Sequence, residues 1–257
     1  MLTTLKNTAR WQISSSVLHG FMGAVQSAYG YAQDLNESLN NIRIVTGYDT
    51  AQMAKFAEEA NRAAKALSTT TTAYTDASLI FYQQGLSGDA VTERADVVIK
   101  MANVTGESAT EVSDYMTAVW NNFADGAKEL EYYADVMTAL GAATASSTDE
   151  IAAGLEKFAA VSETVGLSYE YATAALATVT ATTRQSADVV GTAFKTLFAR
   201  IQDLELGETL DDGTTLGTYS QALAKVGINI KDTSGQLKDM DVILEEMASK
   251  WDGLSKA

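Results

Sequence analysis

The chain of 257 residues contains no proline. Proline removes a backbone hydrogen-bond donor and clashes with the preceding turn, so its absence leaves every segment free to form an uninterrupted helix. Hydrophobic residues make up 46% of the chain and charged residues 20%, which suffices to bury a core and is unlike a disordered protein. The sequence therefore predicts an all-α protein built from many helices.

The N-terminal segment, from about Ala9 to Val45, carries a heptad pattern. Apolar residues recur there at alternating spacings of three and four, as on the a and d positions of a helix that packs lengthwise on a partner. We name these positions the seam: Leu18, Phe21, Val25, Ala28, Ala32, Leu35, Leu39 and Ile42. The pattern predicts one long N-terminal helix that ends at Gly47, and we expect residues 1–47 to form a region of their own.

The partner of this seam stays open at the level of the sequence. Met22 and Tyr29 flank the seam, so the apolar face is wider than a two-stranded coiled coil needs. In one interpretation the helix packs on the other helices of its own chain. In the other, part of the seam meets further copies of the chain in a trimer or hexamer. The seam is accordingly the candidate site for oligomerisation.

The remaining residues, 48–257, repeat a simple order of capping residue, helix and glycine. Asp49 with Gln52 and Ser108 with Glu111 fit the capping box, as does the pair that begins at Ser147. These signals predict a compact domain of short helices over residues 48–257. One of these helices, beginning near Ser186, is strongly amphipathic. Its residues expected to face inward are Val189, Val190, Ala193, Leu197, Ile201 and Leu204.

Residues 226–251 read VGINIKDTSGQLKDMDVILEEMASKW and begin with a β-branched run. We expect a small β-hairpin here, with Ile228 and Ile230 on one arm, the turn at 232–235 and Leu237 on the other arm. A lone hairpin is marginal in water, so it should pack on the helices. The turn partly matches a calcium loop, but an apolar residue takes the first ligand position. Ion binding by this turn is left open.

The composition argues against several kinds of chemistry. The formal net charge of −15 opposes a direct grip on nucleic acid, and the chain has no cysteine for disulfides or thiolate catalysis. The single histidine, His19, falls in the first helix, far from any nucleophile motif and without partners for zinc. No phosphate-binding glycine loop occurs. We therefore expect no enzyme activity, no cofactor and no metal site.

Membrane and secretion signals are also weak. No run of about 18 apolar residues occurs, so the sequence predicts no transmembrane helix and gives no sign of membrane contact. The stretch after Arg10 imitates a signal peptide, but Ser14, His19 and Gln26 interrupt it, and we reject that interpretation.

Four stretches resemble the core region of phage tail tape measure proteins, of the kind found in long-tailed phages and prophages of Gram-positive bacteria. They are SLNNIRIVTGYD, LIFYQQGLSGDAVTERADVVIKMANVTG followed by TAVWNNF, VVGTAFKTLFARIQ, and the stretch 226–251 quoted above. Their order and spacing, rather than their chemistry, carry the resemblance. It extends from about Ala9 to Trp251.

The resemblance implies a structural protein that sets tail length during assembly and takes a further part in genome ejection. It implies contacts with other copies, the tail tube protein, tail assembly chaperones, and tail tip or baseplate proteins. It also implies a place in the tail tube lumen or tail tip of the virion, and in the host cytoplasm during assembly. Such proteins are usually much longer, so we expect this chain to be a fragment. The part whose length sets the tail length would then lie elsewhere in the longer protein.

Two alternative functions are left open by the sequence. One is a module for cell-wall penetration, associated with a peptidoglycan hydrolase, which release of peptidoglycan fragments would detect. The other is a membrane-active helical module, in which the small residues of the first helix insert or associate. Dye leakage from liposomes would separate this function from the first.

Overall fold

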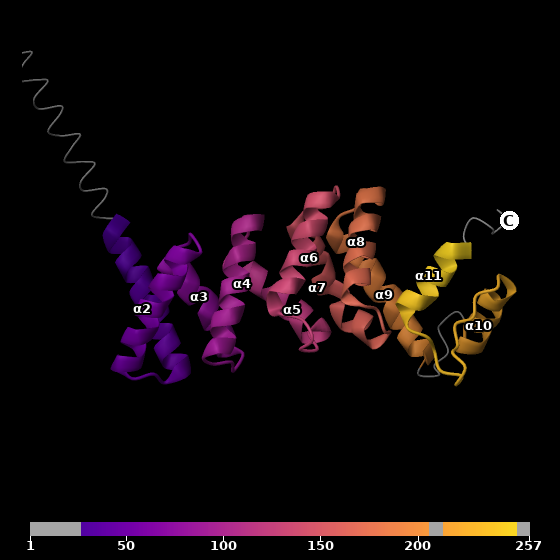
Figure 1. Ribbon diagram of the computed structural model, residues 1–257, viewed down its shortest axis with the longest axis horizontal. Helices are drawn as coiled ribbons and strands as arrows, with labels where there is room; N and C mark the ends of the chain where they lie inside the picture. Colours follow the sequence, from indigo (N-terminus) through magenta and orange to yellow (C-terminus); the bar gives the residue numbers. More distant parts are fainter. Residues whose placement is uncertain (1–26, 206–212, 251–257) are drawn as a thin grey trace, which may run out of the picture. The chain divides into compact units, whose positions relative to one another are not determined.

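The computed structural model describes residues 27–205 and 213–250, and within them it consists of helices joined by turns (Figure 1). The predicted all-α fold is confirmed for this part of the chain. A first helix covers residues 27–46. The helices that follow are α2 (Thr50–Ala66), α3 (Thr71–Gln83), α4 (Asp89–Thr105), α5 (Ala109–Phe123), α6 (Leu130–Ala143), α7 (Thr148–Thr164), α8 (Tyr169–Thr183), α9 (Ala187–Glu205), α10 (Leu216–Lys225) and α11 (Met240–Lys250).

The helix boundaries follow the capping residues that the sequence indicates. The Asp49 carboxylate accepts the Gln52 backbone N–H at 2.8 Å, and the Gln52 side chain accepts the Asp49 N–H at 2.9 Å. Ser108 and Glu111 make the same reciprocal pair at the start of α5. Gly47 has a φ of +70°, the left-handed conformation that a glycine adopts without a steric penalty at a helix end.

The contacts within the chain divide it into two compact units, residues 1–100 and 101–257, and the division falls inside α4. Each unit is described by itself below. Contact density does not define an independently folding domain. The predicted domain bounds, 1–47 and 48–257, therefore stay a prediction.

In the first unit, α2 and α3 pack against each other. Alanines at Ala60 and Ala64 are buried on α2 and allow a close approach, while Tyr82 of α3 makes edge-on ring contacts with Tyr48 and Phe56. The helix 27–46 is joined to α3 through Ser38, whose hydroxyl donates to the Asp76 carboxylate at 2.6 Å. The first helix is therefore anchored by its C-terminal half.

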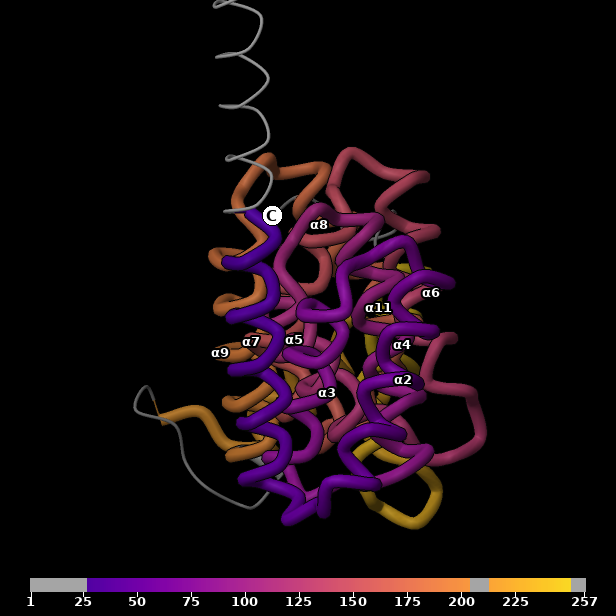
Figure 2. Tube along the Cα trace, turned by 90° about the vertical axis from the view of Figure 1, so that its left-hand side faces the viewer, coloured from indigo at the N-terminus to yellow at the C-terminus, as the bar shows by residue number. Residues whose placement is uncertain are grey.

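In the second unit, α7 is the central helix and packs against α5, α6, α8 and α9 (Figure 2). Its Phe158 is 1% exposed and meets two rings of α9. The ring centroids of Phe158 and Phe194 lie 5.2 Å apart, and those of Phe158 and Phe198 lie 6.0 Å apart. Aromatic pairs in this range add to the free energy of burial. This cluster joins α7 to α9.

Two glycines let the backbones of α7 and α9 approach closely. A methyl group placed on Gly191 would lie 2.5 Å from the carbonyl oxygen of Gly154. A methyl group on Gly154 would lie 2.6 Å from Cδ2 of Leu176 on α8 and 3.2 Å from the carbonyl oxygen of Ala187. Only glycine fits at position 191, where α9 approaches the backbone of α7.

The β-hairpin expected near the C-terminus is wrong, because the described residues 213–250 contain no strand. Lys231 and Leu237 form a single antiparallel bridge. The Asp232 carboxylate accepts the backbone N–H groups of Ser234 and Gln236, so the Gln236 N–H does not pair with a carbonyl of the opposite arm. Ile228 and Ile230 are buried, so the packing expected of this corner is confirmed.

The long N-terminal helix is described only in part. Residues 27–46 are helical and end at Gly47 as expected. The seam residues Leu18, Phe21 and Val25, and the histidine His19, lie outside the described residues. The full length of this helix stays a prediction.

Candidate functional site

The described part of the seam changes from exposed to buried along the helix 27–46. Ala28 and Ala32 are exposed, Leu35 and Leu39 are half-buried, and Ile42 is fully buried. The C-terminal half of the seam is thus covered within its own unit, next to the Ser38 contact with α3. The N-terminal half of the described seam presents an exposed apolar surface. Packing within the chain fits the C-terminal half, and contact with further copies would need the N-terminal half.

Other apolar side chains of this helix are also exposed, at both of its ends. Tyr29 is 68% exposed and Ile44 is 76% exposed, and Tyr31 and Val45 are also exposed. Single exposed apolar residues are common on proteins, but several on one short helix are typical of a contact surface. Asp34 and Glu37 are the exposed acidic residues between them. The helix therefore combines apolar and negative character.

The residues predicted to face inward on α9 are buried only in part. Val190 and Ile201 are buried as predicted, and Phe198, which the prediction left out, is 1% exposed. Val189, Ala193 and Leu197 were expected to face inward, but they are exposed. Because Val189 and Val190 are adjacent, they point about 100° apart on a helix and cannot share one face. The side chain of Leu204 lies outside the described residues.

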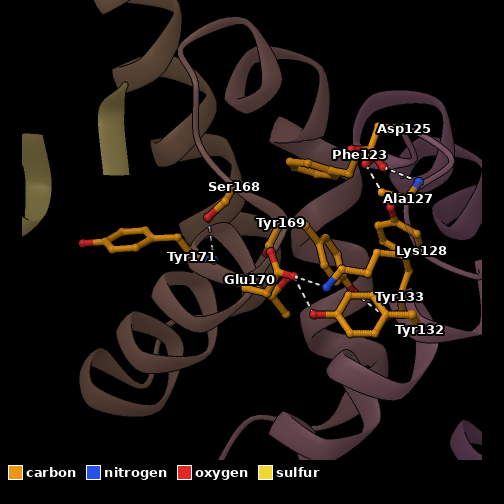
Figure 3. A network of polar contacts seen from close by, with 11 residues as sticks. Phe123, Asp125, Ala127, Lys128, Tyr132, Tyr133, Ser168, Tyr169, Glu170 and Tyr171 are labelled. Atoms are coloured by element: carbon orange, nitrogen blue, oxygen red, sulfur yellow. Dashed lines mark hydrogen bonds and ion pairs between the residues drawn. The ribbon is translucent and has the colours of Figure 1, made fainter. Parts of the chain in front are cut away.

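A polar network joins α6 to α8 in the second unit (Figure 3). The Tyr132 hydroxyl donates to Glu170 Oε1 at 2.5 Å, and the Lys128 ammonium lies 3.4 Å from the same oxygen. This ammonium also sits over the Tyr132 ring, 3.9 Å from its centroid. A cation at that position is attracted to the ring face. The sequence analysis missed this network, because its members are far apart along the chain.

A shallow cavity of about 540 Å³ lies at this network. Phe123 and Tyr169 contribute rings to its wall, and the Tyr133 hydroxyl donates to the Phe123 carbonyl at 3.0 Å. The hydrogen bond from Tyr132 lowers the pKa of the Glu170 carboxyl, and the Lys128 ammonium acts in the same direction. Glu170 is therefore charged at neutral pH and already paired. The arrangement fastens α8 to the loop before α6.

Trp120 is buried in the core. Its indole N–H donates to the Leu130 carbonyl at 3.1 Å, so the ring also fixes the start of α6. Phe123, three residues on, is half-buried in the wall of the cavity. The WNNF stretch thus contributes to the wall of the cavity and to the position of α6 beside the polar network.

A second cavity, of about 400 Å³, is lined by carboxylates at the N-terminal ends of α5, α7 and α9. Glu111 and Glu150 serve the capping boxes of α5 and α7, and Asp188 pairs with Lys157 at 3.5 Å. A hydrogen bond shared with Glu111 raises the pKa of Glu107. Acidic groups at helix N-termini are favourable because they oppose the positive end of the helix dipole. These carboxylates therefore have structural roles.

The polar groups of the acidic turn at 232–235 are hydrogen-bonded to one another. Asp232 Oδ1 accepts the backbone N–H groups of Ser234 and Gln236, at 2.8 and 2.9 Å, and the Ser234 hydroxyl at 2.7 Å. The Ser234 hydroxyl is the main cause that lowers the pKa of Asp232. In the described part of the chain, no group of three or more His, Cys, Asp or Glu side chains is arranged to hold a metal ion. Whether the turn binds an ion stays open.

Within residues 27–205 and 213–250, no helix combines the length and the apolar character needed to cross a bilayer.

The model of a family described as phage-related minor tail protein matches residues 61–257, which is more than half of the chain. The match includes α9, the polar network and the corner before α11. No solved structure matches the chain.

Proposed function

The chain belongs to the family of phage-related minor tail proteins, and from this premise we propose that it is the core region of a tape measure protein. The family membership itself supports a structural role in the phage tail. The finer assignment rests on the four stretches that resemble tape measure proteins. We propose that the phage is a long-tailed phage or prophage of Gram-positive bacteria.

In this role the chain acts through contacts rather than catalysis. It associates with other copies of itself and with the tail tube protein, tail assembly chaperones, and tail tip or baseplate proteins. It takes part in setting the tail length and in genome ejection, from the lumen of the tail tube or the tail tip. During assembly it is in the host cytoplasm.

One observation supports the proposed association most directly. The exposed half of the seam, at Ala28 and Ala32, continues into the buried half at Ile42 on the same helix. The Ser38 hydrogen bond to Asp76 joins the same helix to α3, so the open half continues from an anchored segment. An apolar surface of this kind is stabilised when a partner covers it.

A double substitution in the phage tests the proposal. Ala28→Asp with Ala32→Asp places two carboxylates on the open seam without disturbing Ile42. Asn36→Asp with Asn40→Asp adds the same charge to exposed positions of the same helix and is the matched control.

Electron microscopy of the resulting particles measures the number of tails and the spread of their lengths. We expect the seam variant to give few tails or tails of irregular length, and the control to give normal tails. Normal numbers of tails with unchanged length in the seam variant would contradict the proposal.

A further inference from the structure

The cavity of about 400 Å³ beside α5, α7 and α9 gathers more negative charge than helix capping needs. Seven carboxylates line it, and none of the described residues in its wall is Lys or Arg. We name these seven residues the acidic set: Glu107, Glu111, Asp114, Asp149, Glu150, Glu156 and Asp188. They come from the segment before α5 and from the N-terminal halves of the three helices. The cavity is therefore suited to a positively charged group.

Only some members of the acidic set have partners in the protein. The members with the structural roles given above are Glu107, Glu111, Glu150 and Asp188. Among the residues that the structure describes, the carboxylates of Asp114, Asp149 and Glu156 accept no hydrogen bond and make no ion pair. Asp149 is half-buried, and the other two are exposed. Three carboxylates of the cavity are thus available to a ligand.

The acidic set is crowded enough for its members to act on one another. The hydrogen bond shared with Glu111 raises the pKa of Glu107, and the charge of Asp149 raises it further. Like charges at close range oppose ionisation, and a cation between them favours it. Binding of a cation would therefore relieve a repulsion that the folded chain already contains.

A buried hydroxyl in the wall of the cavity points to a ligand independently of the charge. Tyr115 is 5% exposed, and no hydrogen bond from the described residues reaches its hydroxyl. Burial raises the pKa of this phenol, and the carboxylates of Glu107 and Asp149 raise it further, so the hydroxyl lies toward the acidic set. The Thr105 hydroxyl acts on that pKa in the opposite direction, but it already donates to the Met101 carbonyl at 3.0 Å. A buried hydroxyl without a partner is costly, and a ligand that completes it would gain affinity.

The spacing of the carboxylates selects the shape of the cation. Over residues 27–205 and 213–250, acidic side chains nowhere converge in threes as the ligands of one metal ion would. A guanidinium presents five N–H donors in a planar fork, so it can bridge carboxylates that are too far apart for a single ion. The cavity volume lies in the range of ordinary ligand pockets. An arginine side chain fits these conditions.

We propose that the acidic cavity binds an arginine side chain from a basic segment of a partner protein. The guanidinium donates to Asp114, Asp149 and Glu156, and the Tyr115 hydroxyl accepts a further N–H. This hydroxyl is shielded from water, so a change of rotamer in a neighbouring glutamate accompanies the last contact. The proposal does not depend on self-association through the seam, because it uses other residues on other helices.

A short labelled oligoarginine peptide is the probe, and its fluorescence anisotropy with the full chain measures binding at a fixed ionic strength. The test variant combines Asp114→Asn, Asp149→Asn and Glu156→Gln, which removes three charges of the cavity and keeps both capping glutamates. We expect its dissociation constant to rise by at least about tenfold over that of the wild type, because charge-assisted hydrogen bonds are lost.

The matched control separates the cavity from the general negative charge of the chain. It combines Asp34→Asn, Glu93→Gln and Asp135→Asn, which removes three exposed carboxylates elsewhere. Both variants reduce the net charge by the same amount, and we expect the control to bind within about threefold of the wild type. Equal weakening in both variants would show that the peptide binds the surface charge only, and that result would overturn the proposal. A wild type that does not bind the peptide would also overturn it.

Tyr115→Phe tests the buried hydroxyl without a change of charge. We expect the affinity for the peptide to fall about three- to tenfold. The unfolding midpoint should stay the same or rise, because the hydroxyl makes no hydrogen bond in the free protein. A lower midpoint would show that the hydroxyl has a partner within the protein, and an unchanged affinity would exclude it from the site.

Competition then separates a protein segment from other cations. Unlabelled oligoarginine should displace the labelled peptide, whereas spermidine and magnesium ions at the same ionic strength should not do so at comparable concentrations. Displacement by spermidine would assign the cavity to a free polyamine, and displacement by magnesium would assign it to a metal ion. Either result would overturn the assignment to an arginine of a partner protein.

Discussion

The helices α7 and α9 pack on each other, yet they differ in how many of their large apolar side chains are buried. α7 buries Ile151, Leu155 and Phe158, while its exposed positions are mostly polar, such as Glu156 and Lys157. α9 buries Val190, Phe198 and Ile201 and also exposes Val189 and Leu197. A helix that is apolar on two sides is incompletely covered by its own unit. The comparison separates a helix whose large apolar side chains are covered from one that leaves Val189 and Leu197 exposed.

Removal of a core ring should give the largest effect. Phe158→Ala deletes a side chain that is 1% exposed and contacts both Phe194 and Phe198. We expect the free energy of unfolding to fall by about 3–5 kcal/mol, because the substitution leaves a cavity. Denaturant unfolding of the full chain measures it.

Leu197→Ala is the matched comparison for this substitution. Its side chain is 47% exposed, so we expect the free energy of unfolding to change by less than about 1 kcal/mol. A loss as large as that of Phe158→Ala would mean that Leu197 belongs to the core and would remove the contrast between the helices.

A methyl group at the crossing of α7 and α9 should give an intermediate effect. Gly191→Ala brings Cβ to 2.5 Å from the Gly154 carbonyl oxygen, so the helices must separate. We expect a loss of about 1–3 kcal/mol in the free energy of unfolding, although alanine is the better helix former. The thermal unfolding midpoint measures this, and a midpoint equal to or above that of the wild type would show that the crossing is not tight.

The network that fastens α8 should give the smallest effect, and it should depend on pH. The pKa of Glu170 is lowered in the folded state, so its contribution to stability is present above the ordinary pKa of 4.5. It is lost as the pH falls through the lower folded value. The side chains are half-exposed, so we expect at most about 1 kcal/mol.

Glu170→Gln isolates this part of the pH dependence. At pH 7 the variant should be slightly less stable than the wild type, and the difference should shrink as the pH falls below about 4.5. Unfolding midpoints at a series of pH values provide the measurement. A difference that stays constant down to pH 3 would mean that the Glu170 charge is not its source.

The sequence was sufficient to predict the helices because their signals are local. Capping pairs such as Ser108 with Glu111, and glycines such as Gly47, act within a few residues. Periodicity could not decide which face of α9 lies inward. Val189 and Val190 are equally apolar, and only the position of α7 selects Val190 for the core.

The functional surfaces were predictable to different degrees. The seam was visible as a heptad pattern, but the pattern does not show that Ala28 is exposed and Ile42 is buried, because this depends on which other helices pack beside it. The network of Lys128, Tyr132 and Glu170 gave no signal in the sequence, since its members come together only through the packing of α6 and α8. The β-branched run at Ile228 suggested strands, but the Asp232 turn and the start of α11 leave only one bridge.

The most direct test of the central claim is the solution mass of the full chain, measured by light scattering over a concentration series. The open half of the seam predicts a mass that rises with concentration above that of one chain, 27.3 kDa. A mass of one chain at every concentration would contradict the claim that this apolar surface joins copies of the protein.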